Sequence, residues 1–149
     1  IDDFIRLNKK VYERKNIKAP YNEQTFLNLD KACAQRNARK IFIAVDEDGR
    51  HHAGVYIVWD KNSAYYLLSG SDPELRNSGA TSLCLWEAIK FASTVTKEFN
   101  FEGSMIEPVE RFVRAFGGKQ KLVFNISKTP SLLLRLRSFL LSFKGNNTN

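Results

Sequence analysis

The short alternating segment Phe99-Asn100-Phe101-Glu102-Gly103 contains a carboxylate, Glu102, that could act as a general base. The alternation of aromatic and polar residues predicts a very short strand, which ends at the break Gly103-Ser104. An amine that attacks a carbonyl group must lose a proton, and Glu102 could accept it directly or through water. Two alternatives stay open: Glu102 could bind a cationic amine, or it could be a surface carboxylate paired with Arg111 or Arg114.

Other side chains could assist such a reaction. Ser104 and Tyr66 carry hydroxyl groups that could protonate a leaving group. Arg114 could contact an anionic substrate, although an arginine on a helix more often belongs to a solvated face. His51 and His52 are expected in an exposed turn between two strands, where we predict no catalytic role.

A polar loop at residues 70–79 precedes the best helix that the sequence predicts. Unpaired backbone N–H groups and the helix dipole make such a helix N-terminus a place where anions bind. Arg76 adds a guanidinium group that can contact phosphate or carboxylate through two hydrogen bonds. The alternative is an ordinary capped loop in which Ser78 accepts hydrogen bonds from backbone donors.

The spacing of apolar residues predicts the elements that must position these groups. Helices are expected at 2–14, 23–37, 80–97 and 107–115, and strands at 40–45, 53–59, 64–69, 99–101 and 121–127. Tight turns at 46–49 and 60–63 would join the first three strands into an antiparallel meander. In the helix at 80–97, the residues expected to face the core are Leu83, Trp86, Ala88, Ile89 and Ala92-Ser93. The predicted fold class is α+β, a mixed and mainly antiparallel sheet flanked by helices.

The order of these elements, with Arg76-Asn77-Ser78-Gly79-Ala80 between a strand and a long helix, resembles the GNAT acetyltransferase fold in a single lobe. More narrowly, four segments look like the FemAB-type peptidoglycan bridge-forming aminoacyltransferases and their acetyltransferase-like relatives. These segments are 65–70, 86–89, 99–103 and 112–118, the last ending in Phe116-Gly117-Gly118.

The resemblance implies transfer of an acyl group, from acyl-CoA or aminoacyl-tRNA, to the amine of a small molecule or peptide. It further implies a cytoplasmic bacterial enzyme with a place in cell-envelope or peptidoglycan metabolism. The backbone of Leu68, Ser69 and Gly70 would contact the donor's pantetheine arm. The loop of Arg76, Asn77, Ser78 and Gly79 would hold its pyrophosphate.

One residue departs from the phosphate signature of that family. Thr81 stands where a small residue is expected, and a β-branched side chain there would crowd a pyrophosphate. The alternative function is therefore a lobe that keeps the fold and binds a partner or substrate without turnover.

Composition, the start of the chain and the two cysteines predict further features of the protein. With 43% apolar residues in 149, the chain should fold as a globule. Because it begins inside an amphipathic pattern, we expect residues 1–128 to be the C-terminal lobe of a longer protein and 129–149 to be an amphipathic helix with a frayed tail. Cys33 and Cys84 lie far apart without metal-ligand spacing, so we predict small buried thiols and no metal.

The C-terminal segment is basic. Residues 128–149 carry four basic side chains and no acidic one, which is +4 of the net charge of +7. The apolar stripe of 131–144 could pack on this lobe or on a missing N-terminal lobe. It could equally lie on an anionic membrane surface.

Overall fold

The computed structural model describes residues 1–103, 106–122, 124, 126, 128, 130–132 and 134. The chain divides into two compact units, Ile1–Lys119 and Gln120–Asn149. Ser104 and nearly all of the predicted amphipathic helix at 131–144 lie outside the described residues. No helix in the described part of the chain is long and apolar enough to cross a membrane.

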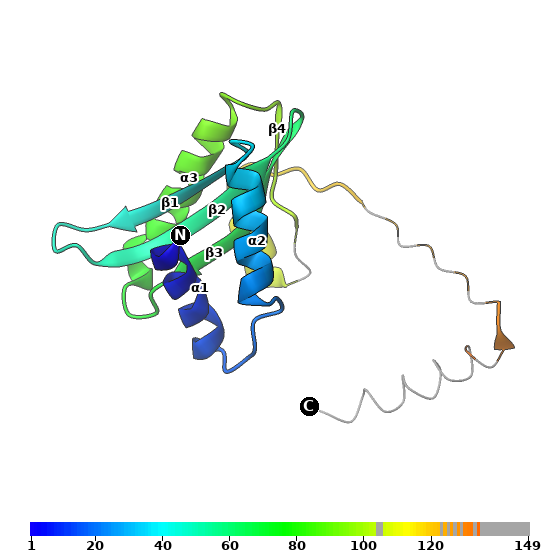
Figure 1. Cartoon of the computed structure of the whole chain (residues 1–149), viewed down its shortest axis with the longest axis horizontal. Coiled ribbons are helices and arrows are strands. Elements are labelled where there is room, and N and C mark those ends of the chain that lie inside the picture. The colour runs from blue at the N-terminus through cyan, green and yellow to red at the C-terminus, as the bar shows by residue number, and fades with distance from the viewer. Residues whose placement is uncertain are drawn as a thin grey trace. The chain divides into compact units, whose positions relative to one another are not determined.

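The first unit is a four-stranded sheet with helices on both faces (Figure 1). Its elements are α1 (Asp2–Arg14), α2 (Glu23–Ala34), β1 (Arg39–Val45), β2 (His51–Trp59), β3 (Ser63–Ser71), the short 3₁₀ helix η1 (Arg76–Ser78), α3 (Ala80–Ala92), β4 (Glu98–Asn100) and α4 (Glu107–Arg114). The sheet order is β1-β2-β3-β4, with β1, β2 and β3 antiparallel and β4 parallel to β3. The α+β fold class predicted from the sequence is confirmed.

Local sequence explains where several elements begin. The side chain of Asn22 accepts a hydrogen bond from the Gln24 backbone N–H at 2.8 Å, so Asn22 caps α2 as expected. Asp46 and Asp60 carboxylates accept backbone N–H groups in the turns after β1 and β2, which closes the meander. α3 ends at Ala92, earlier than predicted, because the hydroxyl groups of Ser93 and Thr94 bond back to carbonyl oxygens of the last turn.

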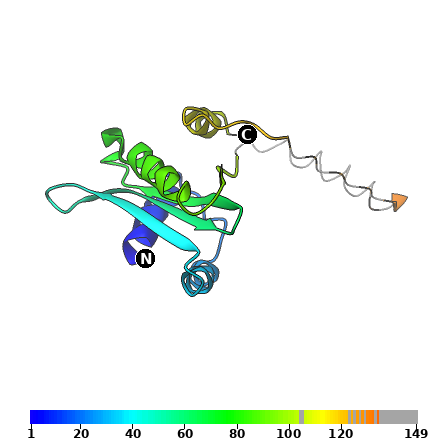
Figure 2. The ribbon, with the colours of Figure 1, turned by 90° about the horizontal axis from the view of Figure 1, so that it is seen from above.

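Two apolar clusters lie on opposite faces of the sheet. Figure 2 shows α3 on one face and α1 with α2 on the other. Val55 and Ile57 of β2 pack under α3, whereas Tyr56 between them packs against Phe4 of α1 and Phe26 of α2. Successive side chains of a strand point to opposite faces, so β2 contributes to both clusters.

The predicted core face of α3 is partly wrong. Ala88 and Ala92 are buried and Ile89 is half-buried. In contrast, Leu83 is 56% and Trp86 50% exposed, and Ser93 is also exposed. The buried residues of α3 are Ala80, Cys84, Leu85, Ala88 and Ala92. α3 is apolar on more than one side, so spacing alone did not determine which side faces the sheet. Cys84 is buried and Cys33 half-buried, and both thiols are free.

The strand predicted at 121–127 is also wrong where the structure describes it. Residues 121, 122, 124 and 126 belong to no strand. Leu122, Phe124 and Ile126 are 76%, 80% and 91% exposed. A strand needs a neighbouring strand to pair its backbone groups, and an alternating sequence pattern does not supply that neighbour.

Candidate functional site

The sheet opens between β3 and β4. The two strands pair over three positions only, Ser63 with Glu98, Ala64 with Phe99 and Tyr65 with Asn100. β3 then continues to Ser71 after β4 has ended, so in the described part of the chain no strand lies along this edge of residues 66–71. On its other edge β3 pairs with β2, with a register shift that leaves Leu67 as an extra residue. The resulting bulge lies beside the opening.

The predicted donor-binding residues of β3 make close contacts with α1. Leu68 packs near Phe4 and Tyr56. The Ser69 carbonyl oxygen accepts a hydrogen bond from Asn8 Nδ2 at 2.5 Å, and Asn8 is buried. A Cβ atom on Gly70 would lie 2.4 Å from the Asn8 backbone nitrogen. Gly70, predicted for donor contact, therefore has a packing reason as well: it lets the backbone of α1 approach the strand.

Tyr66 lies on the α3 side of β3, half-buried beside the cluster of Val55 and Cys84. Burial raises the pKa of its hydroxyl group, and a hydrogen bond from Ser69 offsets part of this effect. The phenol stays protonated at neutral pH, as a proton donor must. The catalytic role of Tyr66 stays a prediction, as does that of Ser104.

Glu102 occupies a strained turn directly after β4. Its φ is +62°, whereas the other non-glycine residues with positive φ in the described part of the chain are Asn16 and Asn37. Asparagine tolerates this region, but a glutamate loses about 1–2 kcal/mol there. The Asn100 side chain stabilises the turn by accepting the Glu102 backbone N–H at 2.8 Å. Strain of this kind is concentrated at functional sites.

The charge of Glu102 is exposed and lies near the strand opening. Its negative charge is among the influences that raise the pKa of Tyr65, after the hydrogen bond to Asp60 and desolvation. Arg111 pairs with Glu107 at 3.3 Å and Arg114 with Glu110 at 2.5 Å. Both arginines thus form ion pairs within α4 instead of the pairing with Glu102 that the sequence allowed.

The loop predicted to bind an anion leads into α3 through η1 and Gly79, and its anion-binding role stays a prediction. Gly79 adopts a φ of +73° and precedes α3 without a side-chain cap. Arg76 and Asn77 are exposed in η1, while Thr81 is half-buried in the first turn of α3. The alternative in which Ser78 caps the loop is not what the structure has, because Gly79 occupies the N-cap position of α3 and no side chain makes a cap hydrogen bond there.

The predicted exposed turn at His51 and His52 is wrong. Both His51 and His52 belong to β2 and not to a turn, and the His52 side chain is only 15% exposed. Its Nε2 lies 2.8 Å from Asp46 Oδ2 and its Nδ1 lies 2.9 Å from Ser78 Oγ. This hydrogen bond to His52, followed by those from Arg50, holds the pKa of Asp46 well below its usual range. The short turn between Asp46 and His52 could have indicated their contact. Nothing in the nearby sequence indicates the contact between His52 and Ser78.

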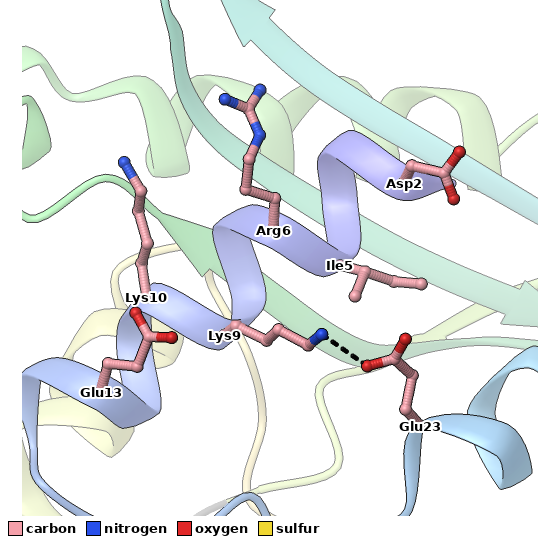
Figure 3. Close-up of a pocket in the computed structure, with 7 residues that line it drawn as sticks. All are labelled: Asp2, Ile5, Arg6, Lys9, Lys10, Glu13 and Glu23. Atoms are coloured by element: carbon pink, nitrogen blue, oxygen red, sulfur yellow. Dashed lines mark ion pairs between the residues drawn. The ribbon is translucent and has the colours of Figure 1, made fainter.

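A separate hollow of about 400 Å³ lies beside α1 and α2 (Figure 3). Six of its seven lining residues are charged, and Lys9 pairs with Glu23 across it at 2.6 Å. None of the predicted site residues lines it. Within the described residues, no group of three His, Cys, Asp or Glu side chains could hold a metal ion.

Solved structures share this fold. An aminoglycoside acetyltransferase from an uncultured soil metagenomic sample, in complex with sisomicin, is 17% identical with a TM-score of 0.63, covering 87% of this chain and 88% of that one. An aminoglycoside 6′-N-acetyltransferase from Acinetobacter haemolyticus is 15% identical with a TM-score of 0.59, covering 83% and 92%. A mutant BH1408 protein from Bacillus halodurans is 15% identical with a TM-score of 0.62, covering 86% and 93%. No curated protein matches the sequence significantly.

The sheet opening, the bulged β3 and the loop leading into α3 define an acetyltransferase fold of the GNAT class. The chain belongs to the acetyltransferase (GNAT) domain family, which matches residues 1–101. The resemblance drawn from the sequence is therefore confirmed at the level of this family, whose members use acetyl-CoA. The narrower FemAB-type resemblance stays a prediction.

Proposed function

We propose that this chain is an N-acetyltransferase that moves the acetyl group of acetyl-CoA to an amine of a small molecule. The observation that carries the proposal is the opening between β3 and β4, with the strained Glu102 at the end of β4. The similar aminoglycoside acetyltransferases support an amine acceptor of small size. Amines of peptides are a second class of acceptor, which the resemblance to FemAB-type enzymes implies.

The donor would lie along the free edge of β3 and end at the loop before α3. Backbone groups near Leu68, Ser69 and Gly70 would contact its pantetheine arm. The backbone N–H groups of Ser78, Gly79 and the first turn of α3, together with Arg76 and Asn77, would hold the pyrophosphate. Acetyl-CoA, when bound, supplies the activated thioester.

The side chains around the opening would accept and donate the protons of the reaction. Glu102 accepts the proton of the attacking amine, directly or through water, while the new N–C bond forms. Backbone N–H groups on the open edge of β3 stabilise the negative oxygen of the tetrahedral intermediate. The hydroxyl of Tyr66 or Ser104 would donate a proton to the thiolate that leaves when the C–S bond of the donor breaks. Arg114 would contact an anionic part of the acceptor, in exchange with its Glu110 partner.

The test is a thiol-release assay with the purified chain, acetyl-CoA and a panel of amines that includes aminoglycosides and short peptides. Release of free CoA that depends on the amine, with the acetylated amine identified by mass spectrometry, would support the proposal. Saturable binding of acetyl-CoA without turnover for any amine would instead favour a non-catalytic lobe. Absence of acetyl-CoA binding in calorimetry would rule out a CoA-dependent transferase.

Thr81 favours a second candidate. Its branched side chain in the first turn of α3 would crowd a pyrophosphate, and aminoacyl-tRNA carries none at its reactive end. A FemAB-type aminoacyl transfer in peptidoglycan metabolism would then be the function. Transfer of a labelled amino acid from aminoacyl-tRNA to a peptide amine tests it. Peripheral membrane contact by residues 131–144, a missing N-terminal lobe and a cytoplasmic location stay predictions from the sequence.

A further inference from the structure

His52 contacts the loop between β3 and α3 near both of its ends. Its backbone carbonyl accepts a hydrogen bond from the Asp72 N–H at 2.8 Å. Its ring Nδ1 lies 2.9 Å from Ser78 Oγ. Asp72 begins this loop and Ser78 ends η1, immediately before Gly79 and α3. A single β2 residue thus supports the segment that is proposed to bind the donor's pyrophosphate.

The opposite side of the His52 ring is fixed by an ionised carboxylate. Asp46 accepts hydrogen bonds from the Asp48 N–H at 3.1 Å, the Arg50 N–H at 2.9 Å and Arg50 Nε at 2.7 Å. Because the pKa of Asp46 is lowered, above all by His52, the carboxylate is charged at neutral pH and can only accept. Nε2 of His52, 2.8 Å away, must therefore carry a hydrogen.

The state of Nδ1 depends on the direction of the Ser78 hydroxyl. Ser78 Oγ lies 2.8 Å from the Leu75 carbonyl oxygen and 2.9 Å from Nδ1, and it has only one hydrogen to donate. If that hydrogen goes to Leu75, Nδ1 must donate to Ser78, and the ring carries a positive charge. If the ring is neutral, the hydroxyl must turn to Nδ1, and the bond that helps to close η1 is lost.

We propose that His52 is a positioning residue whose protonation controls the affinity of the loop at residues 72–79 for the anionic part of the donor. The charged ring keeps Ser78 turned to Leu75 and adds positive charge beneath the loop. The neutral ring does neither. This inference rests on the proposed function, in which residues 76–79 bind the pyrophosphate.

The charged groups around His52 are consistent with this role. Asp46 and Arg50 face it from the β1–β2 turn, Arg76 lies in η1, and Asp72 begins the loop. Lys10 of α1 pairs with Asp72 at 2.5 Å, and this contact lowers the pKa of Asp72 so that it is also ionised at neutral pH. Among side chains of these types, only an imidazole ordinarily changes charge between about pH 5 and 8.

The neighbouring histidine provides a matched control. His51 Nδ1 lies 2.9 Å from an Arg6 guanidinium nitrogen and 3.2 Å from Asp3 Oδ1. Both partners belong to α1, and neither is part of the loop before α3. His51→Gln therefore removes one titratable ring from the same strand without touching Ser78.

The experiment is calorimetric titration of the full chain with CoA from about pH 5.5 to 8.5, for the wild type, His52→Gln and His51→Gln. Glutamine can donate to Asp46 and accept from Ser78 but does not titrate. We expect the wild type to bind CoA about tenfold more tightly than His52→Gln at the acidic end, and the two to converge at the alkaline end. His51→Gln should follow the wild type throughout. The phosphates of CoA titrate alike in all three proteins, so differences between them isolate the histidine.

Two results would overturn the inference in distinguishable ways. CoA binding by the wild type, with the same affinity and pH profile in His52→Gln, would remove the positioning role and leave the proposed function intact. Failure of the folded wild type to bind CoA at any pH would remove the proposed function and this inference with it. If His52→Gln does not fold, Ser78→Ala carries the test, since it keeps the His52–Asp46 contact and should lose the part of the excess affinity at acidic pH that depends on the Ser78 hydroxyl.

Discussion

Gly70 of β3 lies directly against the backbone of Asn8 in α1. A Cβ atom at position 70 would be 2.4 Å from the Asn8 nitrogen and 2.8 Å from its Cα, and both of these are backbone atoms. The same helix residue reaches back through its side chain to the Ser69 carbonyl oxygen. Contacts with α1 therefore hold Ser69 and Gly70, which lie in the part of β3 with the open edge, in place.

Gly70→Ala should strongly destabilise the fold. Neither the strand nor the helix backbone can move without breaking the contacts between α1 and β3, so we expect a loss of at least about 3 kcal/mol in the free energy of unfolding, measured by urea denaturation. Gly49→Ala is the control, because Gly49 has a φ of +76° but open space around it. It should lose only about 1–2 kcal/mol from backbone strain. Equal effects of the two changes would contradict the close approach.

Tyr56→Phe should weaken the buried contact between β2 and α2. The Tyr56 hydroxyl donates to Asp30 Oδ1 at 2.9 Å, and both residues are buried. Arg39 Nε lies 2.9 Å from the same oxygen, but its N–H does not point at a hydrogen-bond acceptor, so the ion pair alone does not replace the lost donor. We expect a loss of about 1–3 kcal/mol in the free energy of unfolding.

The same tyrosine predicts a pH dependence. Burial, followed by the hydrogen bond to Asp30, raises the pKa of Tyr56 far above its ordinary value. The folded state therefore favours the protonated phenol, and this contribution to stability is fully present below about pH 10 and is lost above it. Denaturation of the wild type and Tyr56→Phe at increasing pH should show their stabilities converging above about pH 10. A difference between the wild type and Tyr56→Phe that stays constant across this pH range would refute the assignment.

Glu102→Gln should separate the two roles open to this carboxylate. If Glu102 is the general base, kcat should fall by about 100-fold or more while KM for the amine changes little, because the proton acceptor is lost only in the transition state. If it binds a cationic amine, KM for the amine should rise instead. Steady-state kinetics with the best amine distinguish these outcomes. Glu107→Gln, on the exposed face of α4, is the control, and wild-type kinetics for both variants would exclude a role for Glu102.

Arg76→Ala should weaken donor binding without slowing the chemical step. Removing the guanidinium group from η1 should raise KM for acetyl-CoA about tenfold, equivalent to ~1.4 kcal/mol, with kcat unchanged. The effect should shrink at high salt, since Arg76 is exposed. Arg111→Ala removes another exposed arginine, from α4, and should leave KM for acetyl-CoA unchanged. A fall in kcat alone for Arg76→Ala would argue against pyrophosphate binding at this loop.

Local patterns in the sequence were sufficient for most elements. The periodicity of residues 2–14, the Asn22 cap and the turns at Asp46 and Asp60 each depend on neighbours within a few positions, and all are present in the structure. The same reasoning failed for α3, where Leu83 and Trp86 are as apolar as the residues that pack on the sheet. It also failed at the described residues of the range 121–127, because strand pairing depends on a distant partner.

The sequence by itself determined the α+β order, the polar loop before α3 and the carboxylate after β4, because these features depend on residue type and short-range spacing. Only the tertiary structure decided that β4 leaves β3 after three residue pairs, that Gly70 faces the α1 backbone and that His52 joins Asp46 to Ser78. The β3–β4 pairing, the approach of Gly70 to α1 and the His52–Ser78 contact link residues 26 or more positions apart through the sheet and its flanking helices. Such contacts are set by how whole elements pack, which no local pattern encodes.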